Sequence, residues 1–471
     1  MKSRHSIALL PLLLTACAVG PDYEPVTTDS ALVDKEWHGV LPHSGRVADL
    51  TRWWSQFDDP SMTQLIERSE MNSPTLDAAL ARINQSRSSA RKSGAALLPS
   101  ITGSASSTRS HSEGGSAGSV SLTQTTNAAS LDAQWEIDLF GGKRRALEES
   151  EAQLQSSEAN WNDARVTLAA EVADAYVQYR ACQNTVDLYE RRLDSQSSTL
   201  SLVDFKVKTG LSAASDGDLS RASTLNDAGM LENQRGVCSQ RFNLIAQLAA
   251  IPASELEKIL TTAPSQVPSP RETDVLDVPA KTIEQRPDVA VAERELAAAS
   301  AAIGVAEAAR YPSFSLSGAI GINKTTGSTD VSTWSYGPAL SVPIFNAGSL
   351  AAEADRARAV FDEKLAAYRE TVRKAAKEVE DALARLDAVN RRMKQAESSV
   401  DHYRQYLKAQ EASYKSGAIS LLDIEETRRA VYNAEQSLIE ARQERAQAWI
   451  AMYKAIGGGW KSSSDNEARS S

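Results

Sequence analysis

Two long stretches of the chain place apolar residues at alternating spacings of three and four. The first lies in a run of 67 residues, 143–209, that contains neither glycine nor proline. Its apolar positions extend from Val172 to Val207 and keep a coiled-coil period for five heptads, with Gln196 as one weak member. An unbroken helix of that length is roughly 100 Å long at about 1.5 Å per residue. The pattern therefore predicts a helix much longer than a globular domain is wide.

The same pattern returns 207 residues later, from Val379 to Tyr414, inside a second glycine- and proline-free run. The matched positions are Gly141 with Gly348, Gly210 with Gly417, Asp216 with Asp423 and, at an offset of 213, Pro74 with Pro287 and Pro99 with Pro312. The six-residue change in offset must fall in the loops between Pro99 and Gly141. A repeat of this size indicates two copies of one supersecondary unit.

The segments that follow Pro99 and Pro312 change to a period of two. Apolar residues alternate with small polar ones over 131–139, 313–323 and 333–344, whereas the strand after Pro99 is less clear. Stretches of about ten residues with one apolar face suit strands that cross a membrane. A soluble sheet with one wet face gives the same alternation, but the small polar side chains and the N-terminal targeting segment favour the membrane. Four strands cannot close a barrel, so we expect the chain to oligomerise.

The N-terminus reads as a lipoprotein signal peptide over residues 1–16. Lys2 and Arg4 precede a short apolar core that is too short to span a bilayer. Leu14-Thr15-Ala16-Cys17 resembles a bacterial lipobox, in which Cys17 is diacylated and becomes the mature N-terminus. Ala18 is compatible with sorting to the outer membrane. The alternative is an ordinary signal peptide in which Cys17 is incidental.

The remaining boundaries follow from the prolines, the glycines and the change of period. An extended segment, 17–60, precedes the first copy, 61–250, which contains a helix (61–97), two strands (within 99–139) and a helical hairpin (143–250). A proline-rich linker, 251–280, leads to the second copy, 281–457, which contains a helix (281–310), two strands (within 312–345) and a hairpin (349–456). A disordered tail, 458–471, follows.

Composition argues against several classes of function. The net charge of −10 disfavours nucleic-acid binding. The five histidines form no HExxH pattern, and neither GxxxxGK[ST] nor GxSxG occurs. We therefore expect no enzyme, no metal and no cofactor.

Two N-terminal motifs complete the picture: Val19-Gly20-Pro21-Asp22-Tyr23-Glu24-Pro25 and Trp53-Trp54-Ser55-Gln56-Phe57-Asp58-Asp59-Pro60. Together with the lipobox and the duplication, they resemble the TolC-like outer-membrane factor family, in the lipoprotein branch that serves resistance-nodulation-division (RND) efflux systems. The resemblance covers nearly the whole mature chain. It implies a mainly α fold with a membrane β part, in which three chains form a 12-stranded β-barrel continuous with a helical coiled-coil barrel.

The resemblance also implies a passive exit duct for small molecules such as drugs. It places the chain in the outer membrane of a Gram-negative bacterium, in contact with lipid, a periplasmic adaptor and an inner-membrane RND transporter. An exit channel for type I secretion is the alternative within transport, although the lipobox favours efflux. A coiled-coil envelope protein without a pore is the alternative from another class.

The match to the family's motif places a periplasmic gate at the second hairpin turn, with Leu422, Asp423 and Glu426 at the constriction. Tyr414 matches a tyrosine that bonds the Asp216 equivalent of a neighbouring hairpin. Ile419 occupies the place of a basic residue that often helps this lock, which leaves part of the lock in doubt. The alternative is that the acidic residues cap helix N-termini.

Two cysteines lie at equal distances from the first hairpin turn. Cys182 precedes Gly210 by 28 residues and Cys238 follows it by 28, so an antiparallel hairpin brings them to similar levels. Because the periplasm is oxidising, we expect a disulfide. Two buried free thiols are the alternative, since the shape of the turn could shift the register.

Overall fold

The computed structural model describes residues 18–31, 50–112, 122–262, 265–270 and 283–458. Cys17 and the predicted signal peptide therefore lie outside the described residues. The chain forms two compact units, one from residues up to 26, 81–158 and 291–369, and the other from 27–80, 159–290 and 370 onward. Each unit contains residues from both copies of the repeat.

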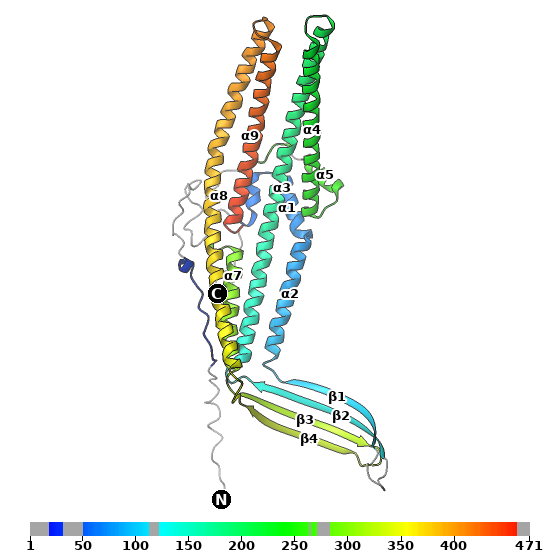
Figure 1. Ribbon diagram of the computed structural model, residues 1–471. Coiled ribbons are helices and arrows are strands. Elements are labelled where there is room, and N and C mark those ends of the chain that lie inside the picture. The colour runs from blue at the N-terminus through cyan, green and yellow to red at the C-terminus, as the bar shows by residue number, and fades with distance from the viewer. Residues whose placement is uncertain (1–17, 32–49, 113–121, 263–264, 271–282, 459–471) are drawn as a thin grey trace. The chain divides into compact units, whose positions relative to one another are not determined.

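The first unit contains one antiparallel sheet of four strands in the order β1-β2-β3-β4 (Figure 1). The strands are β1 (Ser100–Ser112), β2 (Leu122–Ile137), β3 (Ser313–Thr325) and β4 (Val331–Ser341). The register puts Trp135 opposite Leu316 and Ile320 opposite Trp334, so the apolar positions of three strands share one face. The opposite face carries mostly serine, threonine and other small residues, together with Asp132, Gln134 and Glu136 of β2. Within a single chain, β1 and β4 have open edges.

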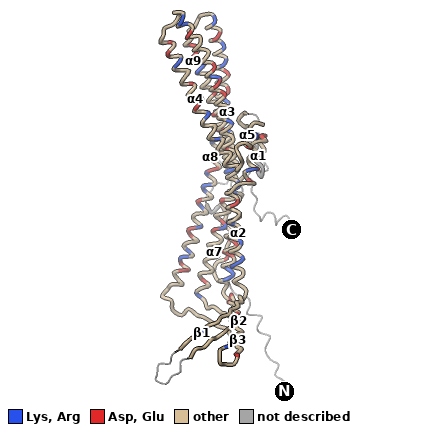
Figure 2. Tube along the Cα trace, turned by 90° about the vertical axis from the view of Figure 1, so that its right-hand side faces the viewer, with Lys and Arg blue, Asp and Glu red and all other residues tan. Residues whose placement is uncertain are grey.

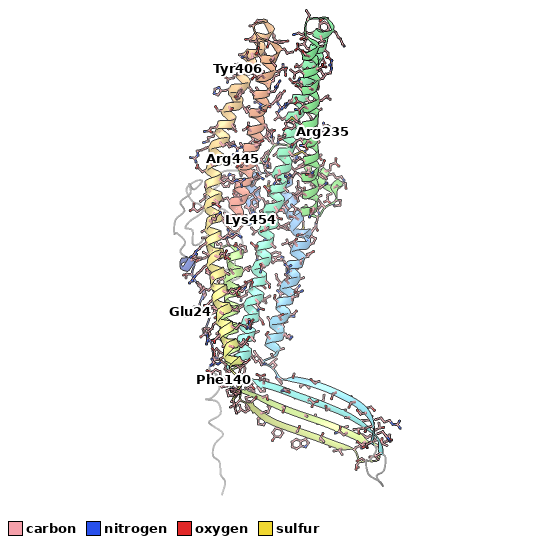
Figure 3. All side chains as sticks on the ribbon, viewed as in Figure 1. Glu24, Phe140, Arg235, Tyr406, Arg445 and Lys454 are labelled. Carbon is pink, nitrogen blue, oxygen red and sulfur yellow. A yellow bond between two sulfur atoms is a disulfide. The ribbon has the colours of Figure 1, made fainter. Side chains whose placement is uncertain are left out.

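Glycines make the corners between strands and long helices. Gly141 and Gly348 occupy equivalent positions in the two copies, and each has φ +83°, which a side chain disfavours. Asp138 accepts the backbone N–H groups of Lys143 (3.1 Å) and Arg144 (2.9 Å), which satisfies two donors of the first helical turn. Phe140, labelled in Figure 3, stacks on Tyr311 at 4.8 Å between ring centroids.

The N-terminal segment packs against the helices of the first unit. The Tyr23 hydroxyl donates to Glu293 (2.7 Å), and buried Arg145 pairs with Asp22 (2.6 Å). A Cβ on Gly20 would lie 2.5 Å from the Cα of Gly304, so glycine is required for this close approach. The first sequence motif is therefore fixed by backbone contact as well as by side chains.

The helices that precede the strands differ from the prediction. The expected helix 61–97 is two helices, α1 (Pro60–Asn72) and α2 (Pro74–Ala95), because Pro74 lacks an N–H and forces Ser73 into an extended conformation. Pro287, its equivalent, is likewise the first residue of α7 (Pro287–Ala308). The helix expected over 281–310 is therefore also interrupted, because residues 283–284 are helical and α7 begins only after a break at residues 285–286.

Four long helices form the two hairpins. They are α3 (Gly142–Lys208), α4 (Ala214–Ala249), α8 (Ser349–Lys415) and α9 (Leu421–Ala455). Both α3 and α8 contain 67 residues. The seam residues are buried or half-buried, except that Tyr403 is 42% exposed. Tyr176 and Leu188, which lie beside the seam, are also buried, because α3 packs against more than one helix.

The largest hydrophobic core lies in the second unit and includes the second N-terminal motif. Trp53 stacks on Tyr453 of α9, with 5.1 Å between ring centroids, and Trp54 and Phe57 are buried beside it. Asp59 caps α1 and accepts the Tyr176 hydroxyl at 2.7 Å.

The predicted linker contains a short amphipathic helix, α5 (Ala253–Thr262), whose Leu256, Ile259 and Leu260 join this core. Buried Arg180 of α3 donates to the carbonyl of Leu260 at 2.9 Å. Among the described helices, none has a stretch both long enough and apolar enough to cross a bilayer.

Candidate functional site

The candidate site is built from the two hairpin turns. After α3, the N–H of Gly210 bonds to the carbonyl of Val207 and that of Leu211 to Lys206, with φ +72° at Gly210. After α8, Gly417 bonds to Tyr414 and Ala418 to Ser413, with φ +78° at Gly417. Both are Schellman terminations, which use glycine to satisfy the last carbonyl groups of a helix. The offset of 207 therefore relates the two turns in geometry as well as in sequence.

In the helix after each turn, the aspartate at the third helical position accepts hydrogen bonds from residues at or just before the N-cap, Ser420 in α9 and Ala213 in α4. Asp423 accepts the Ser420 hydroxyl (2.6 Å) and the Ser420 N–H (2.9 Å). Asp216 accepts the Ser212 hydroxyl (2.7 Å) and the Ala213 N–H (3.3 Å). The two hydrogen bonds from Ser420 lower the pKa of Asp423 below its usual value, and the bond from the Ser420 hydroxyl contributes more than the bond from the Ser420 N–H. Both carboxylates thus accept a backbone N–H group at a helix N-terminus, as the capping alternative expects.

The other predicted gate residues lie close to these caps. Leu422 is 61% exposed in the first turn of α9, and Glu426 is exposed one turn further along. Tyr414 is half-buried in the last turn of α8, and the Lys206 ammonium of α3 lies 5.9 Å from its ring centroid. Leu422, Asp423, Glu426 and Tyr414 therefore share one hairpin end, while Asp216 belongs to the other hairpin.

Sequence reasoning missed a layer of polar pairs in the second unit, in each of which at least one side chain is buried. Arg192 of α3 pairs with Asp227 of α4 at 2.7 Å, and the Thr199 hydroxyl donates to Glu425 of α9 at 2.6 Å. Glu435 of α9, 7% exposed, accepts Arg404 of α8 at 2.5 Å. Each pair joins two different helices, so the layer ties α3 to α4 and α9, and α9 to α8. The adjacent arginines at 191 and 192 were a sequence signal for it, because charges seldom lie beside an apolar seam unless they are paired.

A small cavity of about 120 Å³ lies within this layer. Its lining is mostly charged or hydrogen-bonding and includes Arg192, Asp227, Glu425, Arg428 and Tyr432. Arg428 also donates to Glu425 at 2.7 Å. Figure 2 shows charged residues of both signs along the helices, in contrast to the sheet. The cavity is a gap between paired polar side chains and lacks the apolar lining typical of a small-molecule pocket.

A disulfide joins Cys182 of α3 to Cys238 of α4, with 5.6 Å between the Cα atoms. Cys182 is buried, and the Gln234 amide donates to its sulfur at 3.0 Å. The positions 207 residues later are Val389 and Arg445. The disulfide therefore distinguishes the first hairpin from the second. Arg235, labelled in Figure 3, adds an ion pair to Glu190 of α3 at 2.7 Å nearby.

Within the described ranges, histidine, cysteine and acidic side chains form no group of three that could hold a metal ion. The described residues form long paired helices, hydrogen-bonded hairpin turns, and a sheet with one apolar face and one polar face.

Comparisons with known proteins give the context for this arrangement. A model of the outer membrane efflux protein family matches residues 65–248 and 278–458. Nodulation protein T of Rhizobium leguminosarum bv. viciae is 33% identical over 97% of this chain and 94% of its own length. The pyoverdine export outer membrane protein OpmQ of Pseudomonas aeruginosa is 30% identical over 97% of both chains. The solved structure of the outer-membrane channel OprN has a TM-score of 0.82 and 28% identity, over 94% of this chain and all of that one.

These matches confirm the expected fold class, a TolC-like arrangement of long helices and a small sheet, and the outer-membrane location. Proteins with this fold include named outer-membrane channels, so the sheet is the membrane part and the hairpins are the helical part of a channel. The chain belongs to the outer membrane efflux protein family and is an outer-membrane channel protein of efflux systems.

Proposed function

We propose that three copies of this chain form a passive exit duct that receives small molecules from an inner-membrane RND transporter through a periplasmic adaptor. The observation that carries the proposal is the four-stranded sheet with one apolar face, one polar face and two open edges. In hydrocarbon, unpaired strand edges leave backbone groups unsatisfied, so the sheet requires neighbours. Because every adjacent pair of strands is antiparallel, β4 of one chain and β1 of the next also meet antiparallel, and identical chains close a barrel.

The names of relatives guide the choice of cargo. OpmQ is named for pyoverdine export, and two relatives from Pseudomonas putida are named for antibiotic and for toluene efflux. These cargoes differ greatly in size and polarity, which suits a duct without a tight binding site. We propose drugs or other toxic small molecules for this chain.

Electrophysiology and susceptibility together test this function. Purified full-length chain should be trimeric by native mass spectrometry and should give defined single-channel conductance in a planar bilayer. A deletion strain should become sensitive to several unrelated compounds and recover with the intact gene. Trimers without conductance would favour a non-pore envelope protein, whereas loss of a secreted protein with unchanged susceptibility would favour type I secretion.

We also propose that Cys17 carries lipid, on the strength of the lipobox in the sequence. Cys17→Ser should yield a mature protein without acyl groups, measured by intact mass spectrometry against the unsubstituted chain. An unmodified Cys17 in the unsubstituted chain would contradict the proposal. Channel assembly need not depend on acylation, since the barrel is itself a membrane anchor.

At the helical end, we propose that Leu422, Asp423 and Glu426 form the constriction. Around a symmetry axis, the exposed Leu422 side chains can meet by apolar contact, while the carboxylates repel one another and disfavour anions. A Tyr414–Asp216 hydrogen bond between neighbouring hairpins would add only about 0.5–1.5 kcal/mol net. An adaptor that binds the open form better could therefore override it.

Two double variants test the gate. Asp423→Ala with Glu426→Ala should lower cation selectivity, because it removes the acidic ring. Tyr414→Phe with Leu422→Ser should raise the resting conductance, because it removes the contacts proposed to hold the aperture closed. Asp218→Ala, a change at an exposed carboxylate of the first hairpin outside the gate set, is the control. Unchanged selectivity in the first variant and unchanged conductance in the second would place the constriction elsewhere and leave these carboxylates as helix caps.

A further inference from the structure

The four strands separate positive and negative charge between the two faces of the sheet. Arg109 of β1 and Lys324 of β3 are the lysine and arginine residues of the strands, and both belong to the apolar face. Asp132 and Glu136 of β2 are the acidic residues of the strands, and both belong to the polar face. The proposed duct uses the polar face and gives the two basic residues no role.

The two basic residues lie near each other on adjacent rows of the apolar face. Asn127 of β2 lies opposite Ser107 of β1 and opposite Lys324 of β3, which makes one row across three strands. Arg109 belongs to the next row, opposite Thr125. From the usual spacings within a sheet, the Cα atoms of Arg109 and Lys324 are about 12 Å apart. Both side chains are long, so their charged ends can converge on one group that lies over Asn127.

These rows mark the limit of the apolar part of the face. Between them and the corners at Gly141 and Gly348, large apolar side chains are exposed on the same face, among them Leu131, Ile320, Ile322 and Trp334. Beyond them the chain turns at residues 326–330. A basic side chain that faces lipid is unfavourable at the middle of a bilayer and nearly neutral at its surface. The position of Arg109 and Lys324 therefore indicates the level of the lipid headgroups.

Both basic side chains are available to an anionic group. The Lys324 ammonium lies 3.4 Å from the Asp330 carboxylate, and the two side chains are 68% and 59% exposed. An exposed ion pair of this kind contributes little, so a phosphate can compete with Asp330 for the ammonium. Arg109 is exposed, and no residue within the described ranges forms an ion pair with it. Its guanidinium presents paired donors that match the geometry of a phosphate.

We propose that Arg109, Asn127 and Lys324 bind the phosphate group of a lipid A-type molecule, in which a phosphorylated disaccharide carries several acyl chains. The acyl chains lie against the exposed apolar side chains of the same face, such as Ile322. The proposal rests on the orientation of the proposed duct, with its helices in the periplasm. In that orientation the site lies in the outer leaflet, and the phosphate supplies the negative charge that the two basic residues lack.

Lipid titration followed by native mass spectrometry measures this binding directly. Full-length protein in detergent is titrated with lipid A, and the fraction of lipid-bound protein is recorded at each concentration. In Arg109→Gln with Lys324→Gln, the affinity should fall about thirtyfold, because each basic residue near an anionic headgroup contributes roughly a factor of five. Lipid A without phosphate groups should bind the unsubstituted protein as weakly as lipid A binds this double variant.

Two further variants separate the site from general charge effects. Arg109→Lys with Lys324→Arg keeps both charges and should recover most of the affinity. Lys408→Gln with Lys415→Gln removes two charges from exposed positions of α8, outside the sheet, and should leave the affinity unchanged. The Arg109→Gln, Lys324→Gln variant should keep the single-channel conductance of the unsubstituted chain, because both positions face away from the lumen. This conductance shows that the variant is folded and assembled.

The possible results have separate meanings. Equal affinity of lipid A for the double glutamine variant and the unsubstituted chain would overturn the site. Equal affinity of phosphate-free lipid A would show that acyl chains alone hold the lipid and would overturn it as well. If phosphatidylglycerol binds as tightly through the same two residues, the assignment to lipid A is wrong. Absence of conductance in the unsubstituted chain would instead contradict the proposed function.

Discussion

The disulfide between Cys182 and Cys238 should stabilise the first hairpin and leave the second unaffected. The bridged residues are 56 positions apart. In the chain-entropy treatment, closing a loop of that size removes about 4 kcal/mol of freedom from the unfolded hairpin, and measured values are usually about 2–4 kcal/mol. The second hairpin carries Val389 and Arg445 at the equivalent positions and serves as an internal reference.

Hydrogen exchange of the assembled protein can measure this effect locally, because helical segments open separately from the whole chain. In a Cys182→Ala, Cys238→Ala variant, amides of α3 and α4 between the two positions should exchange about thirty- to a thousandfold faster, which corresponds to 2–4 kcal/mol. Amides of α8 and α9 between positions 389 and 445 should keep their rates.

Two results would refute this reasoning. Peptide mapping after thiol labelling of unfolded, unreduced protein would reveal Cys182 and Cys238 as free thiols if no bridge forms. Equal acceleration in both hairpins would show that the substitutions disturb the helical assembly as a whole, instead of releasing one loop. A Gln234→Ala variant controls for packing, because it removes the amide that contacts the Cys182 sulfur while keeping the bridge.

Three further predictions use the same structure. Gly20→Ala should weaken docking of the N-terminal segment by about 1–3 kcal/mol and expose it to proteolysis, since the new Cβ would lie 2.5 Å from Gly304. Gly229→Ala, with no atom near its Cβ in α4, should raise helix stability by about 0.5–1 kcal/mol in hydrogen exchange. Asp132→Asn should lower the cation-to-anion permeability ratio measured in a salt gradient, because it removes a carboxylate from the polar face of β2, whereas Lys324→Gln on the other face should not.

The Asp132 prediction depends on which charges face the lumen. On the polar face of the described strands, Asp132 and Glu136 are the charged residues, and Lys143 lies 3.1 Å from Glu136. In Figure 2 most of the sheet is correspondingly free of charge colour. An unchanged permeability ratio in Asp132→Asn would show that the strand lumen does not select ions. Absence of any conductance in the unsubstituted chain would contradict the duct itself.

Local signals in the sequence predicted the parts of the fold that local forces decide. Glycine-free heptads gave the long helices, and Gly210 and Gly417 marked terminations whose geometry requires a positive φ. Strand β1 was the weak prediction, because serine, threonine and glycine supply small side chains to both of its faces and hide the period of two. The break between α1 and α2 carried a clear signal in Pro74, which the continuous helical pattern on both sides obscured.

Long-range contacts account for most of what the sequence did not reveal. The ion pair of Arg192 with Asp227 depends on the relative rotation of two helices, which a single helical pattern does not determine. The same holds for Glu425, which reads as one more acidic residue near a helix start but is buried against Thr199. At the candidate gate, the sequence did not distinguish the two exposed carboxylates: Asp423 accepts the Ser420 N–H at 2.9 Å, and Glu426 lies one helical turn further along.

The two copies show which features the duplicated unit needs. The pair Ser100–Gln134 of the first copy corresponds to Ser313–Ser341 of the second, so Gln134 is replaced by a serine while the strand register is unchanged. The register therefore depends on the alternation of apolar and polar faces and on the corners at Gly141 and Gly348. A barrel built from repeated units closes only if each pair of neighbouring strands keeps the same register, so the strands of the two copies must stay similar. The helical hairpins do not have to match in this way. The hairpin α3–α4 contains a disulfide, whereas α8–α9 has Val389 and Arg445 at the equivalent positions. Differences between the copies can therefore accumulate in the helices without disturbing the membrane part.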